Sequence, residues 1–182
     1  MEATLRGGLF HDETQGAIAR ATLSGMNEQA SPKIPQSVLV VIYTPQREVL
    51  LIERAKQPGF WQSVTGSKDH LDESWTATAI REVQEETGIQ VGSDRVPLEA
   101  LQDWGVENVY EIYPVWRHRY APDVTTNTEH LFSLNLPGRT DIRLAENEHR
   151  AAIWLAADDA AARCFSWSNR DAIRLIQRHL AD

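Results

Sequence analysis

The sequence predicts an α/β protein, an α/β/α sandwich built around a mixed β-sheet. Short apolar runs rich in β-branched residues are typical of buried strands. A longer segment among them carries an apolar stripe at helical spacing, and two further helical segments close the chain. Strands and helices that interleave in this order suit helices packed on both faces of one sheet.

One domain is expected over residues 35–182, after an N-terminal extension at residues 1–34. The chain has 182 residues, of which 42% are hydrophobic and 24% are charged, as is normal for one globular domain with a full core. The extension is rich in Gly, Ser, Thr and Ala and has no sustained apolar period. We therefore expect it to be poorly ordered.

The domain is expected to begin with a β-hairpin. Residues 37–43 (SVLVVIY) form an apolar run of strand length, a turn containing Pro45 follows, and residues 49–52 return as the second strand. A further extended segment at residues 60–65 leads directly to Gly66.

A helix is expected from about residue 73 to residue 87. Ala77, Ile80 and Val83 form an apolar stripe at positions i, i+3 and i+6, which predicts that this side packs on the sheet. Gly88 follows the last helical residue, where a glycine commonly ends a helix.

Three more strands are expected after this helix. Residues 109–120 alternate between two faces over a long span, and Pro114 within them predicts an edge strand or a bulge. Residues 129–136 and 152–155 are the other two candidates.

Two helices should close the chain. The second is expected to begin at Ser166 or Ser168 as the N-cap. Its apolar positions have broadly helical spacing and are Ala172, Ile173, Leu175, Ile176 and Leu180.

Composition excludes several classes of function. The formal net charge of −8 argues against general nucleic-acid binding but leaves room for a local positive pocket, so a small-molecule substrate is expected. The chain has no apolar run of membrane-spanning length and no apolar centre of a signal peptide in residues 1–34. The single cysteine, Cys164, fits a reducing compartment. We therefore expect a cytoplasmic protein.

Three carboxylates lie on one side of the first helix. At 100° per residue, Glu82, Glu85 and Glu86 fall within roughly 100° of arc. Like charges at this spacing repel one another, and a bound divalent cation is one reason to gather them. A solvated acidic face is the alternative, because glutamate is a good helix former.

The surrounding pattern favours the cation site. Residues 81–89 read REVQEETGI, and Glu73 precedes Arg81 by eight positions. This pattern resembles the Nudix box, G-x5-E-x7-R-E-U-x-E-E-x-G-U, where U is aliphatic. The chain matches every fixed position from Glu73 onward, but Gly66 is followed by six residues instead of five. We interpret the extra residue as an insertion in a surface loop.

The resemblance implies the Nudix fold and hydrolysis of a nucleoside or related diphosphate linked to another group, with Mg²⁺ or Mn²⁺ as cofactor. It implies structural roles for Glu73 and for Arg81, which would orient a carboxylate of the catalytic set. A glutamate outside the box commonly completes the site, and Glu148 is the candidate. The implied metal ligands are Glu82, Glu85, Glu86 and Glu148, and the implied catalytic residues are Glu82, Glu85, Glu86 and Arg81.

Several strings outside the box resemble the Nudix subfamily that hydrolyses dihydroneopterin triphosphate in bacterial folate synthesis. Among them are FWQSVTG at residues 60–66, RHRYAP at residues 117–122 and SWSNR at residues 166–170. The resemblance implies cleavage of 7,8-dihydroneopterin triphosphate to dihydroneopterin monophosphate and pyrophosphate. The residues that it places against substrate are Lys33, Arg54, Thr65, Tyr110, Glu111, Ile112, Tyr113 and Ser166.

Two other functions stay open at this point. A broader Nudix pyrophosphohydrolase acting on nucleoside triphosphates or on RNA ends would keep the same glutamates and differ only in its pocket. A non-catalytic Nudix module that binds a ligand is less favoured, because every glutamate of the box is present.

Overall fold

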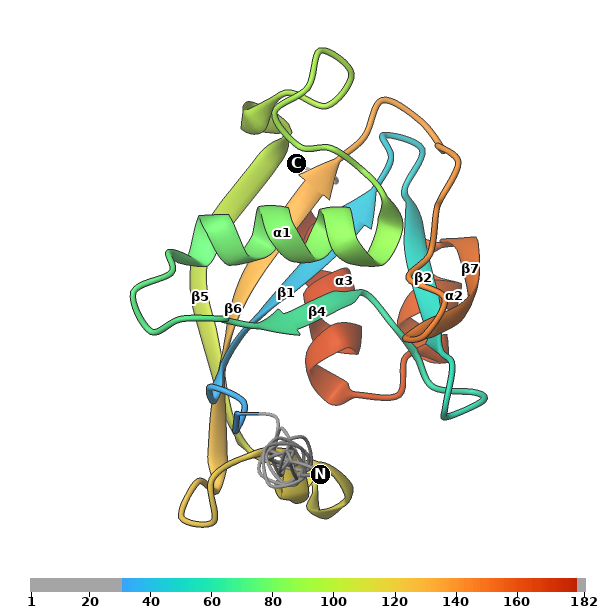
Figure 1. The fold of residues 1–182 in the computed structure, drawn as a ribbon. Helices are drawn as coiled ribbons and strands as arrows, with labels where there is room; N and C mark the ends of the chain where they lie inside the picture. Colours follow the sequence, from blue (N-terminus) through green and yellow to red (C-terminus); the bar gives the residue numbers. More distant parts are fainter. Residues whose placement is uncertain (1–30, 180–182) are drawn as a thin grey trace, which may run out of the picture. The chain divides into compact units, whose positions relative to one another are not determined.

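A computed structural model describes residues 31–179, which form the predicted α/β/α sandwich (Figure 1). The strands are β1 (Gln36–Tyr43), β2 (Glu48–Arg54), β3 (Trp61–Gln62), β4 (Val64–Ser67), β5 (Leu101–Glu111), β6 (Thr126–Asn135) and β7 (His149–Ala156). The helices are α1 (Trp75–Thr87), α2 (Ala157–Arg163) and α3 (Trp167–His179), with 3-10 turns η1 (Leu98–Ala100) and η2 (Pro114–Arg119). Nearly all of the expected extension at residues 1–34 lies outside the described residues.

The described strands form one mixed sheet. Its main path is β3-β2-β1-β6-β5, while β4 pairs with β1 and β7 pairs with β2. β1 and β6 run parallel, and the other pairs are antiparallel. The predicted hairpin of β1 and β2 is in register only at Tyr43 and Val49, and beyond that point β4 pairs with Ser37–Val40 of β1. This pairing brings the residues before the acidic helix into the middle of the fold.

Successive residues of β1 belong to two different cores. Leu39 and Val41 belong to the core that contains Ile173 of α3. Val38 and Val40 belong to the core that contains Val83 of α1. Because side chains alternate along a strand, this pattern places helices on both faces of the sheet. In Figure 1, α1 lies in front of the sheet, with α2 and α3 behind it.

Helix α1 has a defined cap at each end. The Ser74 hydroxyl accepts a hydrogen bond from the amide of Ala77 at 3.1 Å, which satisfies one free donor of the first turn. At the other end Gly88 has a φ of 74°, and its amide donates to the Gln84 carbonyl at 2.9 Å. The predicted C-cap is confirmed, because this left-handed conformation favours glycine.

The predicted apolar stripe of α1 was wrong in part. Val83 is buried against the sheet as expected, but Ala77 is exposed and Ile80 is only half-buried. The buried face contains Ala79 and Val83 together with the carboxylates of Glu82 and Glu86. The helix therefore turns Glu82 and Glu86 toward the sheet, and the side that carries Ala77 and Ile80 is turned partly toward solvent.

The predicted strand at residues 109–120 was also wrong in its bounds. β5 begins earlier, at Leu101, and its ladder ends at Glu111. Pro114 then opens the 3-10 turn η2, because proline has no amide to continue a ladder and its φ is fixed in the helical range. The turn brings Tyr113 and Trp116 together, with ring centroids 5.4 Å apart.

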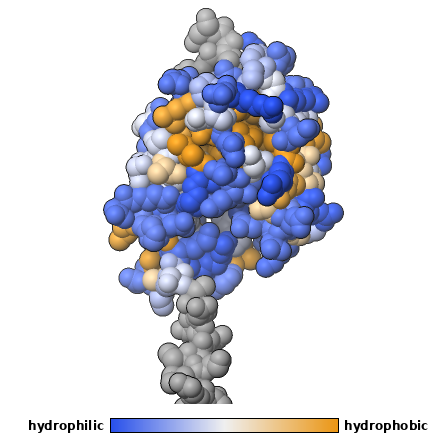
Figure 2. All heavy atoms as spheres, turned by 45° about the horizontal axis from the view of Figure 1, so that its top comes forward, coloured by the Kyte–Doolittle hydropathy of each residue, from blue (hydrophilic) through white to orange (hydrophobic). Residues whose placement is uncertain are grey.

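None of the described helices is long and apolar enough to cross a membrane. Figure 2 shows a face on which hydrophobic residues form patches between hydrophilic ones.

The Gly88→Ala substitution should lower the free energy of unfolding by about 1–2 kcal/mol, measured by urea denaturation. Alanine is strained at positive φ, and its Cβ would lie 3.1 Å from the Cβ of Arg143. Gly138→Ala is the matched control, because its added Cβ has no neighbour within 4 Å, and it should change stability by less than about 0.5 kcal/mol. Equal losses in the two variants would contradict this account of the cap.

Candidate active site

Glu82 of α1 lies directly over the backbone of β4. A Cβ added to Gly66 would lie 1.7 Å from the carboxyl carbon of Glu82, so no larger residue fits at position 66 without moving this group. Burial and the neighbouring charge of Glu86 raise the pKa of Glu82 to about 7, although Arg81 acts in the opposite direction. The glycine of the box is therefore needed to seat a carboxylate.

Glu86 is held one turn further along the same face. Its Oε2 accepts from the amide of Thr65 at 3.2 Å, and its Oε1 lies 2.9 Å from Nε2 of His149. Burial raises the pKa of the Glu86 carboxyl, while His149 and the Thr65 amide lower it by a smaller amount. Two acidic groups thus lie side by side in a site that disfavours their charge.

Arg81 links the carboxylates of this region. Its Nη1 donates to Oε1 of Glu82 at 2.7 Å and to Oε2 of Glu85 at 3.2 Å, while its Nε donates to Oε1 of Glu73 at 3.1 Å. Nη2 also donates to the Ser67 carbonyl at 2.8 Å. The planar guanidinium can hold several acceptors in fixed directions, so it orients the carboxylates as predicted.

The loop between β4 and α1 absorbs the extra residue of the box. Residues 69–72 are exposed, and the amide of Asp69 donates to Oε2 of Glu73 at 2.8 Å. Asp69 also forms an ion pair with Arg81 at 3.3 Å. Glu73 therefore closes the loop, which agrees with the structural role predicted for it.

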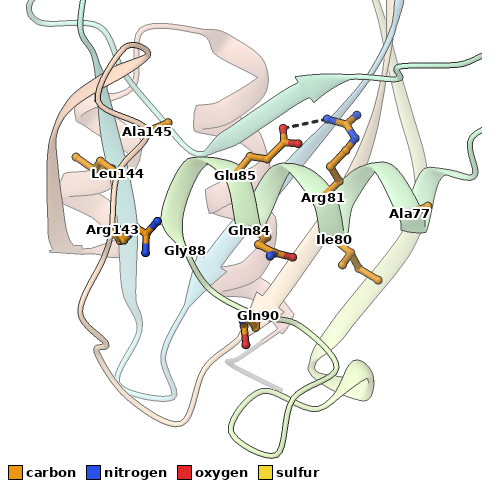
Figure 3. Close-up of a pocket in the computed structure, with 10 residues that line it drawn as sticks. All are labelled: Ala77, Ile80, Arg81, Gln84, Glu85, Gly88, Gln90, Arg143, Leu144 and Ala145. Carbon is orange, nitrogen blue, oxygen red and sulfur yellow. Dashed lines mark hydrogen bonds and ion pairs between the residues drawn. The ribbon is translucent and has the colours of Figure 1, made fainter.

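Glu85 occupies a different environment from the other two box carboxylates. It lies at the edge of a groove between α1 and residues 143–145, with its side chain 58% exposed. Figure 3 shows Glu85 and Arg81 turned toward each other on the same side of the helix, with Ile80 and Gln84 directed elsewhere. Ligation of a metal by Glu85 stays a prediction.

Glu148 and His149 approach Glu86 from the start of β7. One ligand atom each from Glu86, Glu148 and His149 lies within 4.8 Å of the others. The backbone here is fixed, because the amide of Ala55 donates to the Glu148 carbonyl at 2.8 Å. Hard carboxylate oxygens gathered around crowded negative charge suit a divalent cation, and an imidazole nitrogen is a ligand for several transition metals.

Two cations face these carboxylates. Lys33 and Arg54 are both half-buried, and burial lowers the pKa of each. Glu82 and Glu148 raise the pKa of Lys33, while Glu86 and Glu148 raise that of Arg54, which shows that the charges lie within reach of one another. Gln62 Oε1 accepts from Arg54 Nε at 2.7 Å. Although the net charge of the protein is negative, these two positive side chains line the site.

Two adjoining hollows have Arg54 and Thr65 in their lining. Aromatic rings line them. Tyr113 lies 5.6 Å from Phe165, and Tyr110 lies 6.3 Å from Trp167, measured between ring centroids. Such rings offer flat apolar faces to a flat ligand. The two hollows share Arg54, Thr65, Tyr110, Tyr113, Trp116 and Glu129.

The hollows are joined to α3 by hydrogen bonds. Asn169 accepts from the amide of Ser63 at 2.7 Å and donates to the Ser166 hydroxyl at 2.8 Å. The Ser166 hydroxyl in turn accepts from the Asn169 amide at 3.2 Å, which makes it the N-cap of α3. These bonds hold the start of α3 against the chain that leads into β4.

The structure brings together most of the residues that the sequence assigned to substrate. Glu111 is the exception, because it is exposed and lines neither hollow. β5 turns successive side chains to opposite sides, so Tyr110 points inward where Glu111 points out. The residues assigned to substrate that do line a hollow are Lys33, Arg54, Thr65, Tyr110, Ile112, Tyr113 and Ser166.

Sequence analysis missed several residues of the site. His149 follows the candidate ligand Glu148, and a histidine beside a carboxylate was the signal available for it. Phe165 was not assigned to the pocket, and no periodic pattern indicates that it lines it. Glu129 begins the strand predicted at residues 129–136 and Asn127 lies before its predicted start, and their side chains were given no role.

Comparison with known proteins identifies the family. The sequence profile of the NUDIX domain matches residues 33–176. The chain belongs to the NUDIX family. Its Nudix relatives include the dihydroneopterin triphosphate diphosphatase of Escherichia coli, which is 48% identical over 144 residues that cover 78% of this chain and 91% of the relative. The Haemophilus influenzae protein of the same name is 37% identical over 140 residues, which cover 76% of this chain and 85% of that protein.

A solved Nudix structure is similar to this chain in both fold and sequence. The Escherichia coli dihydroneopterin triphosphate pyrophosphohydrolase has a TM-score of 0.72 and 45% sequence identity to this chain, covering 79% of this chain and 95% of its own. The Nudix fold and the closer resemblance found in the sequence are confirmed.

The Gly66→Ala substitution should weaken Mn²⁺ binding by about 10- to 100-fold in isothermal calorimetry, because its methyl group displaces the Glu82 carboxyl. Glu82→Ala should weaken binding to a similar extent. If displacement of Glu82 is the whole cause, the double variant Gly66→Ala/Glu82→Ala will bind no more weakly than Glu82→Ala alone. Additive losses in the double variant would show that Gly66 acts in another way.

Proposed function

We propose that this Nudix protein is a Mg²⁺-dependent pyrophosphohydrolase that converts 7,8-dihydroneopterin triphosphate and water into dihydroneopterin monophosphate and pyrophosphate. The observation that carries the proposal is the joining of two environments at Arg54 and Thr65. Acidic groups for a cation lie on one side, and an aromatic-lined hollow lies on the other. Similarity to relatives named for this substrate supports the same reaction. We place this step of folate synthesis in the cytoplasm.

The metal would be held by the carboxylates of Glu86 and Glu148, with Glu82 beside them, while His149 holds the Glu86 carboxyl. A cation bound there supplies charge neutralisation at the phosphates and lowers the pKa of a bound water toward neutrality. Mg²⁺ is the proposed ion, because it is commonly held by a few carboxylates together with substrate phosphates and water. Mn²⁺ is expected to replace it.

The chain's own residues orient the phosphates. Lys33 and Arg54 donate charge-assisted hydrogen bonds to phosphate oxygens, which holds the triphosphate between the hollow and the carboxylates. Arg81 holds Glu82 in one orientation and does not contact substrate. Tyr113, Trp116 and Phe165 receive the flat ring and exclude water from one of its faces. Each end of the substrate therefore meets side chains of matching chemistry.

Hydrolysis of dihydroneopterin triphosphate with release of pyrophosphate should exceed hydrolysis of dATP and other nucleoside triphosphates in kcat/KM. Glu86→Gln should lower kcat for every substrate by at least about 100-fold, because it removes a ligand charge. Glu99→Gln is the matched control, since it removes the same charge from an exposed residue outside the site.

Each result of this comparison decides between the open alternatives. Equal or faster turnover of nucleotides would reject the pterin specificity and favour the broader Nudix pyrophosphohydrolase. No turnover of any substrate would favour the non-catalytic module. Full activity in Glu86→Gln would reject the assigned metal site.

The metal requirement has a separate test. Chelation should abolish activity, and Mg²⁺ should restore it. Glu148→Gln should raise the Mg²⁺ concentration needed for half-maximal activity by about tenfold or more, because one ligand charge is lost. Glu146→Gln, two residues away on the same exposed loop, serves as control. A Mg²⁺ requirement unchanged in Glu148→Gln would remove Glu148 from the ligand set.

A further inference from the structure

Glu129 of β6 is a buried acid for which the phosphate chemistry has no use. It is only 3% exposed, it lines both hollows, and its Oε2 has no hydrogen-bond partner among the described residues. Asn127, two positions earlier on the same strand face, is also 3% exposed and has an unpartnered Oδ1. Buried polar atoms are nearly always paired in native proteins, so two free ones in one pocket wall require an explanation.

The neighbouring hydrogen bonds determine which atoms of Glu129 and Asn127 stay free for a ligand. The Asn127 amide group donates to the Ser37 hydroxyl at 2.7 Å and to the Tyr110 hydroxyl at 3.2 Å. The Tyr110 hydroxyl donates to Glu129 Oε1, also at 3.2 Å. Both N–H donors of the Asn127 amide group and the Tyr110 hydroxyl are therefore used. The unused atoms, Asn127 Oδ1 and Glu129 Oε2, are both acceptors.

No described residue donates to Glu129 Oε2 or to Asn127 Oδ1. Ser168 and Asn108 approach the Glu129 carboxyl closely enough to lower its pKa, but burial raises that pKa by more. Oε2 itself still lacks a partner. Leaving a buried acceptor unpaired is costly, and this cost is recovered when a ligand donates to it.

We propose that Glu129 and Asn127 determine ring specificity by accepting hydrogen bonds from the donor edge of a bound heterocycle. The edge that fits has an exocyclic amino group beside a ring N–H, as in the 2-amino and N3–H groups of a 4-oxo-dihydropterin. Tyr110 holds Glu129 in position, and the aromatic rings of the hollow contact the ring faces. This inference rests on the proposed function, because the same hollow receives the substrate ring.

The test compares dihydroneopterin triphosphate with its 2-oxo analogue, in which oxygen replaces the 2-amino group. The wild-type enzyme should prefer the amino substrate by about 10- to 100-fold in kcat/KM, since the analogue places an acceptor against acceptors. Glu129→Gln should lower kcat/KM for the amino substrate and leave that for the 2-oxo analogue unchanged or higher, because the carboxamide presents an N–H to the new oxygen. Glu99→Gln should keep the wild-type ratio.

The outcomes separate this inference from the proposed function. No wild-type turnover of dihydroneopterin triphosphate would overturn the proposed function. If the wild-type enzyme turns over the two substrates at equal rates, only the ring-edge assignment is overturned. This comparison needs no variant. If Glu129→Gln lowers both rates by the same factor, Glu129 has only a structural role and the assignment is wrong. Thermal unfolding of each variant confirms that the compared proteins are folded.

Discussion

Two buried carboxylates on α1, packed against the backbone of β4, constrain much of the structure around them. Glu82 needs the space that only a glycine leaves at position 66, and Glu86 needs the Thr65 amide. Burying acids is costly, so the surrounding residues must compensate the charge. Arg81 supplies an opposite charge from the box, and His149 of β7 places Nε2 at 2.9 Å from Glu86 Oε1. The strand order that places β4 beside β1 and β7 beside β2 is what makes this compensation possible.

Two chemically different environments lie close together around a short stretch of β4. The carboxylate end is polar and crowded with negative charge, while the ring end is lined by aromatic side chains. Arg54 lies at the junction, with its guanidinium 5.3 Å from the ring centroid of Trp116 and within electrostatic reach of Glu86. A guanidinium can face a ring and an anion at the same time, which a lysine ammonium does less well.

Sequence patterns predicted the parts of the fold that depend on local periodicity. The strand at residues 37–43 and the C-cap at Gly88 were found because burial and backbone conformation leave clear residue signatures. The 3-10 turn after β5 was missed, because alternation continues through Pro114 although the ladder cannot. The rotation of α1 was misjudged because the prediction followed the apolar spacing of Ala77, Ile80 and Val83, whereas Glu82 and Glu86 face the sheet.

The residues of the site also differ in how far the sequence could predict them. The box glutamates share one helix, so their spacing was enough to place them together. His149, Trp116 and Glu129 come from separate elements, and only the pairing of distant strands brings each of them to the site. Their chemistry is visible in the sequence, but their proximity is a property of the tertiary structure.

The hydrogen bond between Asn169 and Ser63 joins residues 106 positions apart in the chain. Contacts of such long sequence separation form late, because a large loop must close before they contribute. During synthesis the Nudix box is therefore complete long before α3 can dock against the chain leading into β4. A nascent domain would have its acidic helix but an open ring pocket, so substrate recognition becomes available only when nearly the whole domain has left the ribosome.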